Sequence, residues 1–146
     1  MTKPATTLNE LIEISRDGLN FYEDAIRHTA NPQLKIVFRG MVDAKNQLIS
    51  ALSERVRERG EKPSDDGTLS GSIRKAYTDV RARFSDKKDA TYVAELEQLE
   101  DRLLAAFEGA ANEGGDPDMH RAIMKNLPKV RLCHEQMRNL KMDLAA

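Results

Sequence analysis

The feature that most constrains the fold is the spacing of apolar residues, which recur every three or four positions along four long segments. This is the period of an α-helix with one buried face, and strand-like alternation is not sustained anywhere in the chain. The segments cover about residues 8–29, 32–59, 87–112 and 117–144. The sequence therefore predicts an all-α protein, folded as a single four-helix-bundle domain over residues 1–146.

Capping residues and helix breakers mark the ends of these segments. Thr7 opens a Thr-x-x-Glu capping box before the first segment. Asn31 and Asp116 each precede a proline, so both are predicted N-caps with proline at the first helical position. Gly60 is a natural end for the second segment, and Pro128 predicts a kink within the last one.

The stretch between the second and third segments is too long for a tight turn. Residues 61–68 are rich in helix breakers and predict a loop. After this loop, an extra short helix is expected over 71–84, from the apolar residues Ile73, Tyr77, Val80 and Phe84. Two helix pairs joined by a long crossover are typical of ferritin-like bundles rather than of bundles with uniformly short loops.

Charge and composition exclude several classes of partner. The formal net charge of −1 provides no overall attraction to nucleic acid or to an anionic membrane, so neither is an expected partner. The single cysteine, Cys133, excludes an internal disulfide framework. The N-terminus lacks the apolar core of a signal peptide, and no apolar run approaches the roughly 18 residues of a membrane span. We therefore expect a cytoplasmic protein.

Four polar residues interrupt the apolar faces, one near the middle of each segment: Glu23, Lys45, Glu100 and His134. Each is flanked at three- or four-residue steps by apolar residues, which places it on or beside the inner face of its helix. A buried carboxylate is costly unless it meets a cation, a metal or several hydrogen-bond donors. The pattern therefore predicts a polar layer across the bundle.

This layer admits two interpretations. Glu23, Glu100 and His134 are suitable ligands for iron, manganese or zinc, whereas a protonated Lys45 has no lone pair and would instead neutralise the carboxylates. Other placements stay open for each residue: Glu23 exposed at the helix border, His134 hydrogen-bonded in the core or an interface, and Lys45 extending outward with its stem buried. Cys133, on the apolar stripe, is expected to be a small core residue rather than an activated thiol.

Several motifs accompany this pattern: Leu8-Asn-Glu-Leu-Ile and Asp17-Gly18-x-x-Phe21-Tyr22-Glu23-x-Ala25 in the first segment, Gly60-Glu-Lys-Pro with Gly67-Thr68 and Gly71 in the crossover, Glu97-x-x-Glu100-Asp101 in the third segment, and His134 in the last. With these motifs the chain resembles the ferritin-like superfamily. More closely, it resembles an uncharacterised family of bacterial ferritin-like four-helix-bundle proteins, over roughly residues 8–140.

The resemblance implies where a metal site would lie. Metal-binding ferritin-like proteins use one Glu from the first helix, Glu-x-x-His from the second, one Glu from the third and Glu-x-x-His from the fourth. Glu23 and Glu100 match the single glutamates, and His134 matches the last histidine. The chain departs from the pattern because Arg131 stands at the bridging glutamate of the last segment and the second segment, with Lys45, has no Glu-x-x-His. The resemblance thus implies a degenerate metal site.

From these observations we expect a ferritin-like bundle that is not an enzyme, has no bound cofactor and serves an interaction or stress-related role as a homo-oligomer. The alternative is a redox-active protein that holds iron or manganese through Glu23, Glu100 and His134. Lys45 separates the two, since an ammonium group stabilises a metal-free layer and opposes a metal. A histidine phosphotransfer protein is disfavoured, because His134 falls on the apolar stripe rather than on an exposed face.

Overall fold

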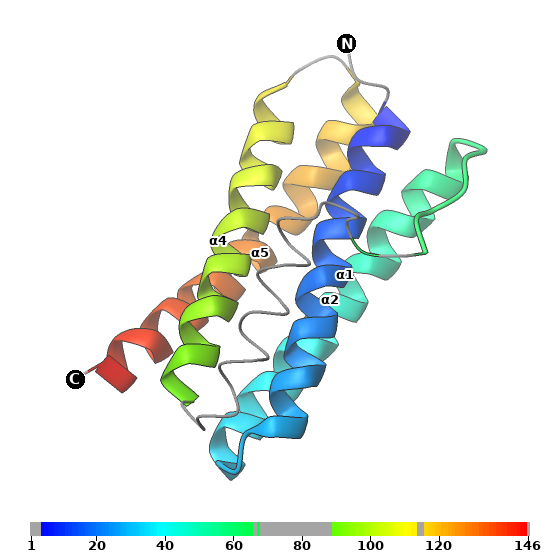
Figure 1. The fold of residues 1–146 in the computed structure, drawn as a ribbon. Coiled ribbons are helices and arrows are strands. Elements are labelled where there is room, and N and C mark those ends of the chain that lie inside the picture. The colour runs from blue at the N-terminus through cyan, green and yellow to red at the C-terminus, as the bar shows by residue number, and fades with distance from the viewer. Residues whose placement is uncertain (1–3, 66, 68–88, 114–115, 146) are drawn as a thin grey trace.

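A computed structural model describes residues 4–65, 67, 89–113 and 116–145, and within them it contains four long helices and no strand. The helices are α1 (Pro4–His28), α2 (Pro32–Glu58), α4 (Asp89–Asn112) and α5 (Pro117–Ala145) (Figure 1). The predicted all-α architecture with four main helices is confirmed. The extra helix expected over 71–84 falls outside the described residues.

The helices pack as two antiparallel pairs, α1 with α2 and α4 with α5, and the pairs meet through α1 against α4 and α2 against α5 (Figure 1). A hydrogen bond from Thr29 to Asp89 joins the end of α1 to the start of α4. An ion pair between Arg59 and Asp116 joins the end of α2 to the start of α5. Consequently α2 and α4 run in the same direction on one diagonal of the bundle, and the connection between them joins opposite ends of it.

The caps predicted for α2 and α5 are confirmed. The Asn31 side chain accepts hydrogen bonds from the backbone N–H groups two and three residues further on. Asp116 accepts from the N–H three residues further on, at 2.8 Å. Gly60 has a φ of 73°, and the N–H groups of Gly60 and Glu61 close a Schellman motif on the last carbonyls of α2. Local sequence therefore determines these helix ends.

The start of α1 differs from the expectation. α1 already begins at Pro4, so Thr7 lies inside the helix and is not its N-cap. Proline is well suited to the first turn because its missing N–H needs no partner there, and this allows the helix to begin before the capping box. The last helix has the predicted extent: α5 runs from Pro117 to Ala145 with Pro128 inside it, and the kink expected at Pro128 stays a prediction. Among the described helices, none is long and apolar enough to cross a membrane.

The core consists of two apolar clusters, one toward each end of the bundle. The first is formed by Leu8, Leu11, Ile12, Leu48, Ile49, Leu52, Val56, Leu103, Phe107, Ala110, Met119, Ile123, Leu127 and Val130. The second is formed by Phe21, Tyr22, Ala25, Leu34, Phe38, Met41, Tyr92, Val93, Leu96, Cys133 and Met137. Between them in the chain lie the buried polar residues Ser15, Lys45 and Glu100, so a polar layer divides the core near mid-height.

The segment that follows α2 is held against the outer face of α1. The Asn9 side chain accepts a hydrogen bond from the Ser64 N–H at 2.8 Å, and the Ser64 hydroxyl donates to Glu13 at 2.9 Å. Gly67 lies directly against Asp17, and a Cβ atom at this glycine would overlap the Asp17 carboxylate. Gly67 therefore permits the chain to approach α1 closely.

Candidate functional site

The centre of the polar layer is an ion pair between Lys45 of α2 and Glu100 of α4. The Lys45 Nζ donates to Glu100 Oε2 at 2.9 Å and also contacts Oε1. The two side chains are only 2% and 1% exposed. Because α2 and α4 are diagonal partners, this pair spans the middle of the bundle. The sequence-based placement of both residues on inner faces is confirmed, and Lys45 does not extend outward to solvent.

Tyr22 of α1 completes the hydrogen bonding of Glu100. Its hydroxyl donates to Glu100 Oε1 at 3.0 Å, and the Lys45 Nζ lies 5.9 Å from the centre of the Tyr22 ring. Burial raises the pKa of Tyr22 well above its usual value of 10.0, and the negative charge of Glu100 and the hydrogen bond to it raise this pKa further. Tyr22 therefore acts as a neutral donor, and Glu100 accepts from two side chains.

Gly18 makes room for the lysine. A Cβ atom at Gly18 would lie 3.4 Å from Lys45 Cε, which is van der Waals contact, so a side chain larger than a methyl group would displace the lysine stem. The glycine in the first segment costs helix propensity relative to alanine. In return, the absence of a side chain at Gly18 lets the lysine stem pass close to the backbone of α1.

Cys133 places α5 beside the same layer. Its thiol is buried, and burial raises the pKa of Cys133 above its usual value of 9.0. The positive charge of Lys45 opposes this rise, and the negative charge of Glu100 adds to it. The predicted role of Cys133 as a small core residue agrees with this environment, because a raised pKa keeps the thiol protonated and weakly nucleophilic.

Glu23 is exposed, which matches the open alternative of a position at the helix border, so its predicted place in the polar layer is wrong. Its neighbour Asp24 is buried instead, and the Tyr92 hydroxyl of α4 donates to Asp24 Oδ2 at 3.2 Å. Arg27 and His28 also contact the Asp24 carboxylate. Glu23 and Asp24 lie on opposite borders of the apolar stripe of α1. Tyr92 of α4 packs over the border on which Asp24 lies, and this contact buries Asp24.

His134 lies at the border between α4 and α5 and not in the central layer. Its Nε2 is 3.1 Å from Asp101 Oδ1 and 3.8 Å from Glu97 Oε1, and its side chain is 17% exposed. Its polar contacts are thus with the carboxylates on either side of Glu100 in α4. This environment matches the open alternative of an interface histidine. Of the four predicted layer residues, the fold pairs Lys45 with Glu100 and leaves Glu23 and His134 apart.

A divalent metal does not fit the centre that the side chains form. Glu100 is engaged by the Lys45 ammonium and the Tyr22 hydroxyl. The ammonium also brings positive charge to the place where a cation would sit, and it has no lone pair to offer. Elsewhere in the described part of the chain, no three His, Cys, Asp or Glu side chains are grouped so that they would hold a metal ion.

Sequence reasoning missed the hydrogen-bonding roles of Tyr22 and Tyr92, which it treated as apolar or did not single out. One signal for Tyr22 was present in the chain. A tyrosine in the middle of an apolar stripe needs a partner for its hydroxyl once it is buried, and Glu100 was an inward carboxylate able to accept from more than the one donor, Lys45, considered for it. For Tyr92 and Asp24, the helix period offers no comparable signal, because Asp24 lies at the border of its stripe.

The fold and site define an all-helical bundle whose centre is closed by an internal ion pair. The sequence profile of a family described as a domain of unknown function (DUF2383) matches residues 3–113, and the chain belongs to this family. The matched region contains Tyr22, Lys45 and Glu100, whereas α5 with Cys133 and His134 lies beyond it. No curated protein with a matching sequence was found.

Proposed function

We propose that this protein is a ferritin-like bundle in which an ion pair replaces the metal centre, and that it serves as a non-enzymatic interaction protein. The observation that carries the proposal is the Lys45–Glu100 pair, buried at mid-height between diagonal helices. In ferritin-like metal proteins the corresponding central space is lined by carboxylates and histidines from all four helices. Here one ammonium neutralises one carboxylate there.

The connectivity supports the ferritin-like part of the proposal. α2 and α4 run in the same direction, and the chain between them joins opposite ends of the bundle (Figure 1). A long crossover of this kind is one of the arrangements that distinguish ferritin-like bundles from up-down bundles with short loops.

The closed state of the central layer supports a role without catalysis there. A catalytic group must come within hydrogen-bond reach of the substrate, yet Lys45 and Glu100 are almost fully buried and bond to each other. Tyr22 is also fully buried, and its hydroxyl is already donated to Glu100. The polar groups of the layer are therefore used to stabilise one arrangement of the four helices.

The test is a metal titration of the untagged protein, purified without chelator, with Fe(II), Mn(II) and Zn(II), followed by mass spectrometry of the desalted protein. We expect no stoichiometric metal in the parent protein. Lys45→Glu, which replaces the ammonium by a second carboxylate facing Glu100, is expected to gain metal affinity. Stoichiometric metal in the parent that is lost in Glu100→Ala and in His134→Ala would overturn the proposal in favour of the redox-active alternative.

The exposed face of α5 supports an interaction role, with a second copy of the chain as partner. Met124, Leu132 and Met142 are large apolar residues that are about half exposed, and with the exposed Pro128 they recur at helical spacing on one side of α5. Large apolar residues gathered on one exposed side of a helix point to an interface more than residues scattered singly over the surface do. Because these side chains are exposed and outside the two core clusters, two copies can oppose this face without disturbing the bundle core.

Light scattering coupled to size-exclusion chromatography tests this part of the proposal. We expect a dimer or larger assembly that dissociates in Leu132→Glu. Ile36→Glu is the matched control, since Ile36 is also a large, exposed apolar residue, on α2, and it should leave the assembly intact. A monomeric parent protein, or equal dissociation by both variants, would contradict a specific interface on α5.

A further inference from the structure

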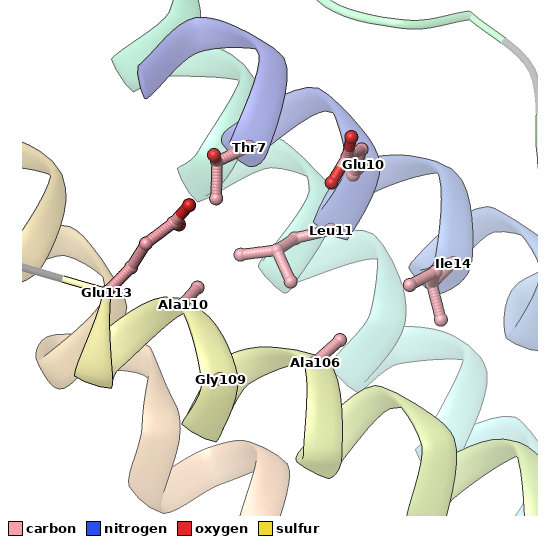
Figure 2. A pocket seen from close by; sticks show the side chains of 8 residues that line it. All are labelled: Thr7, Glu10, Leu11, Ile14, Ala106, Gly109, Ala110 and Glu113. Atoms are coloured by element: carbon pink, nitrogen blue, oxygen red, sulfur yellow. The ribbon is translucent and has the colours of Figure 1, made fainter. Parts of the chain in front are cut away.

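A pocket opens between α1 and α4 at the end of the bundle where α1 begins (Figure 2). Its volume is about 400 Å³, which falls within the range of roughly 300–1,000 Å³ that is usual for small-molecule sites. Leu11 and Ile14 of α1 and Ala106 of α4 form its apolar lining. It lies in the half of the molecule that the first apolar cluster fills, away from the Lys45–Glu100 pair.

The space exists because α4 presents small side chains to α1 at this height. Ala106, Gly109 and Ala110 line the α4 side of the pocket (Figure 2). A Cβ atom at Gly109 would meet nothing within 4 Å, so the glycine is not required by close packing. A larger residue at this position would fill the space, and its absence leaves the pocket open.

Three polar side chains border the apolar lining. Glu10 extends from α1, and Glu113, the residue directly after the end of α4, extends toward α1 (Figure 2). Within the described residues, neither carboxylate forms an ion pair with a basic side chain. Two unneutralised carboxylates, one on α1 and one just past the end of α4, thus give the pocket a negative rim.

Thr7 supplies the third polar group. The residue is 5% exposed, and its side chain lies between the two helices (Figure 2). Among the described residues its hydroxyl has no hydrogen-bond partner. In the same part of the chain, every polar side-chain atom that is fully buried has a hydrogen-bond partner. Since the Thr7 hydroxyl has none, it is not fully buried. The Thr7 hydroxyl is therefore reachable from the pocket and free to accept a hydrogen bond.

From this arrangement we infer that the pocket binds a small organic cation, an ammonium or guanidinium group on a short hydrocarbon body. The lining of Leu11, Ile14 and Ala106 favours hydrocarbon, because its burial removes apolar surface from water. The carboxylates of Glu10 and Glu113 attract the cationic group. The N–H groups of that cation donate to the Thr7 hydroxyl. An anion of the same size meets repulsion at the rim, and a neutral alcohol lacks the charge attraction.

The inference is tested by two-dimensional ¹H–¹⁵N NMR during titration with hexylamine, which is cationic at pH 7, and in parallel with hexan-1-ol and hexanoate. Saturable shifts are expected at the amides of Leu11 and Gly109 with hexylamine, with weaker binding of the alcohol and none of hexanoate. Each of Glu10→Gln and Glu113→Gln should weaken hexylamine binding about two- to fivefold, which is the range for ion pairs near solvent.

Two glycine variants separate a specific site from general surface binding. Gly109→Leu fills the pocket and should abolish the saturable shifts, while leucine favours the helical conformation over glycine. Gly40→Leu is the matched control, because Gly40 is also in a helix, with open space around its Cβ position. Equal affinity for hexylamine and hexan-1-ol, shifts that do not saturate, or unchanged binding in Gly109→Leu would overturn the inference.

Discussion

Replacing Lys45 by methionine tests the central ion pair directly. Methionine keeps an unbranched stem of similar length, so the packing against Gly18 and Tyr22 is retained and only the ammonium is lost. Glu100, with 1% of its side chain exposed, is then left as a buried carboxylate with Tyr22 as its remaining donor. Removing one partner of a buried pair typically costs about 3–5 kcal/mol, a large share of the roughly 5–15 kcal/mol that stabilises a typical domain.

The measurement is urea unfolding followed by far-ultraviolet circular dichroism, on the parent, Lys45→Met, Glu100→Gln and the double variant. Lys45→Met should lower the free energy of unfolding by about 3–5 kcal/mol without a change in the denaturant slope. A loss of this size corresponds to a decrease of roughly 6–20 °C in Tm for a protein of this length. The double variant strands neither charge, so it should be more stable than the summed single losses predict, by about 1–3 kcal/mol.

Lys129→Met is the control, because Lys129 is exposed on α5 and its replacement should change the free energy of unfolding by no more than about 0.5 kcal/mol. A Lys45→Met variant as stable as this control would refute the reasoning. Strictly additive losses in the double variant would also refute it, since they would show that Lys45 and Glu100 do not stabilise each other.

Three further predictions concern the surroundings of the layer and the crossover. Because the pKa of Tyr22 is raised well above 10, its contribution to stability is complete below the unfolded pKa of about 10 and is lost as the pH rises through the folded pKa. In the parent protein the urea concentration at the unfolding midpoint should therefore decrease between about pH 9 and 11, and in Tyr22→Phe it should decrease less. An equal decrease in both proteins would contradict a raised pKa of Tyr22. Burial raises the pKa of Cys133, so its thiol should react with a disulfide reagent at pH 8 at a rate limited by unfolding, and rapid labelling of the native protein would oppose it. Gly67→Ala should lower the free energy of unfolding by about 1–3 kcal/mol, because the added Cβ atom overlaps the Asp17 carboxylate. Adding Asp17→Ala should recover part of that loss in urea unfolding. If nothing is recovered, the overlap with Asp17 is not the cause of the loss.

The sequence by itself determined the helices, most of their ends and the centre of each buried face. The period of the apolar residues predicts four long helices, and the caps at Asn31, Asp116 and Gly60 are found where expected. These features depend on contacts within a few residues along the chain, so local sequence is enough to specify them. Lys45 and Glu100 were predicted to face inward because each is flanked by apolar residues at helical spacing, and a small rotation of the helix does not expose a residue in that position.

Only the tertiary structure decided which polar side chains meet. Glu23 and Asp24 lie on opposite borders of one stripe, and the position of Tyr92 on α4 decides that Asp24 is the buried one. His134 binds the carboxylates beside Glu100 rather than Glu100 itself. These outcomes depend on the rotation and the offset between neighbouring helices, and packing along their whole length sets both. A local pattern shows which face of a helix is buried. Which residue of another helix packs over the border of that face is decided only in the assembled bundle.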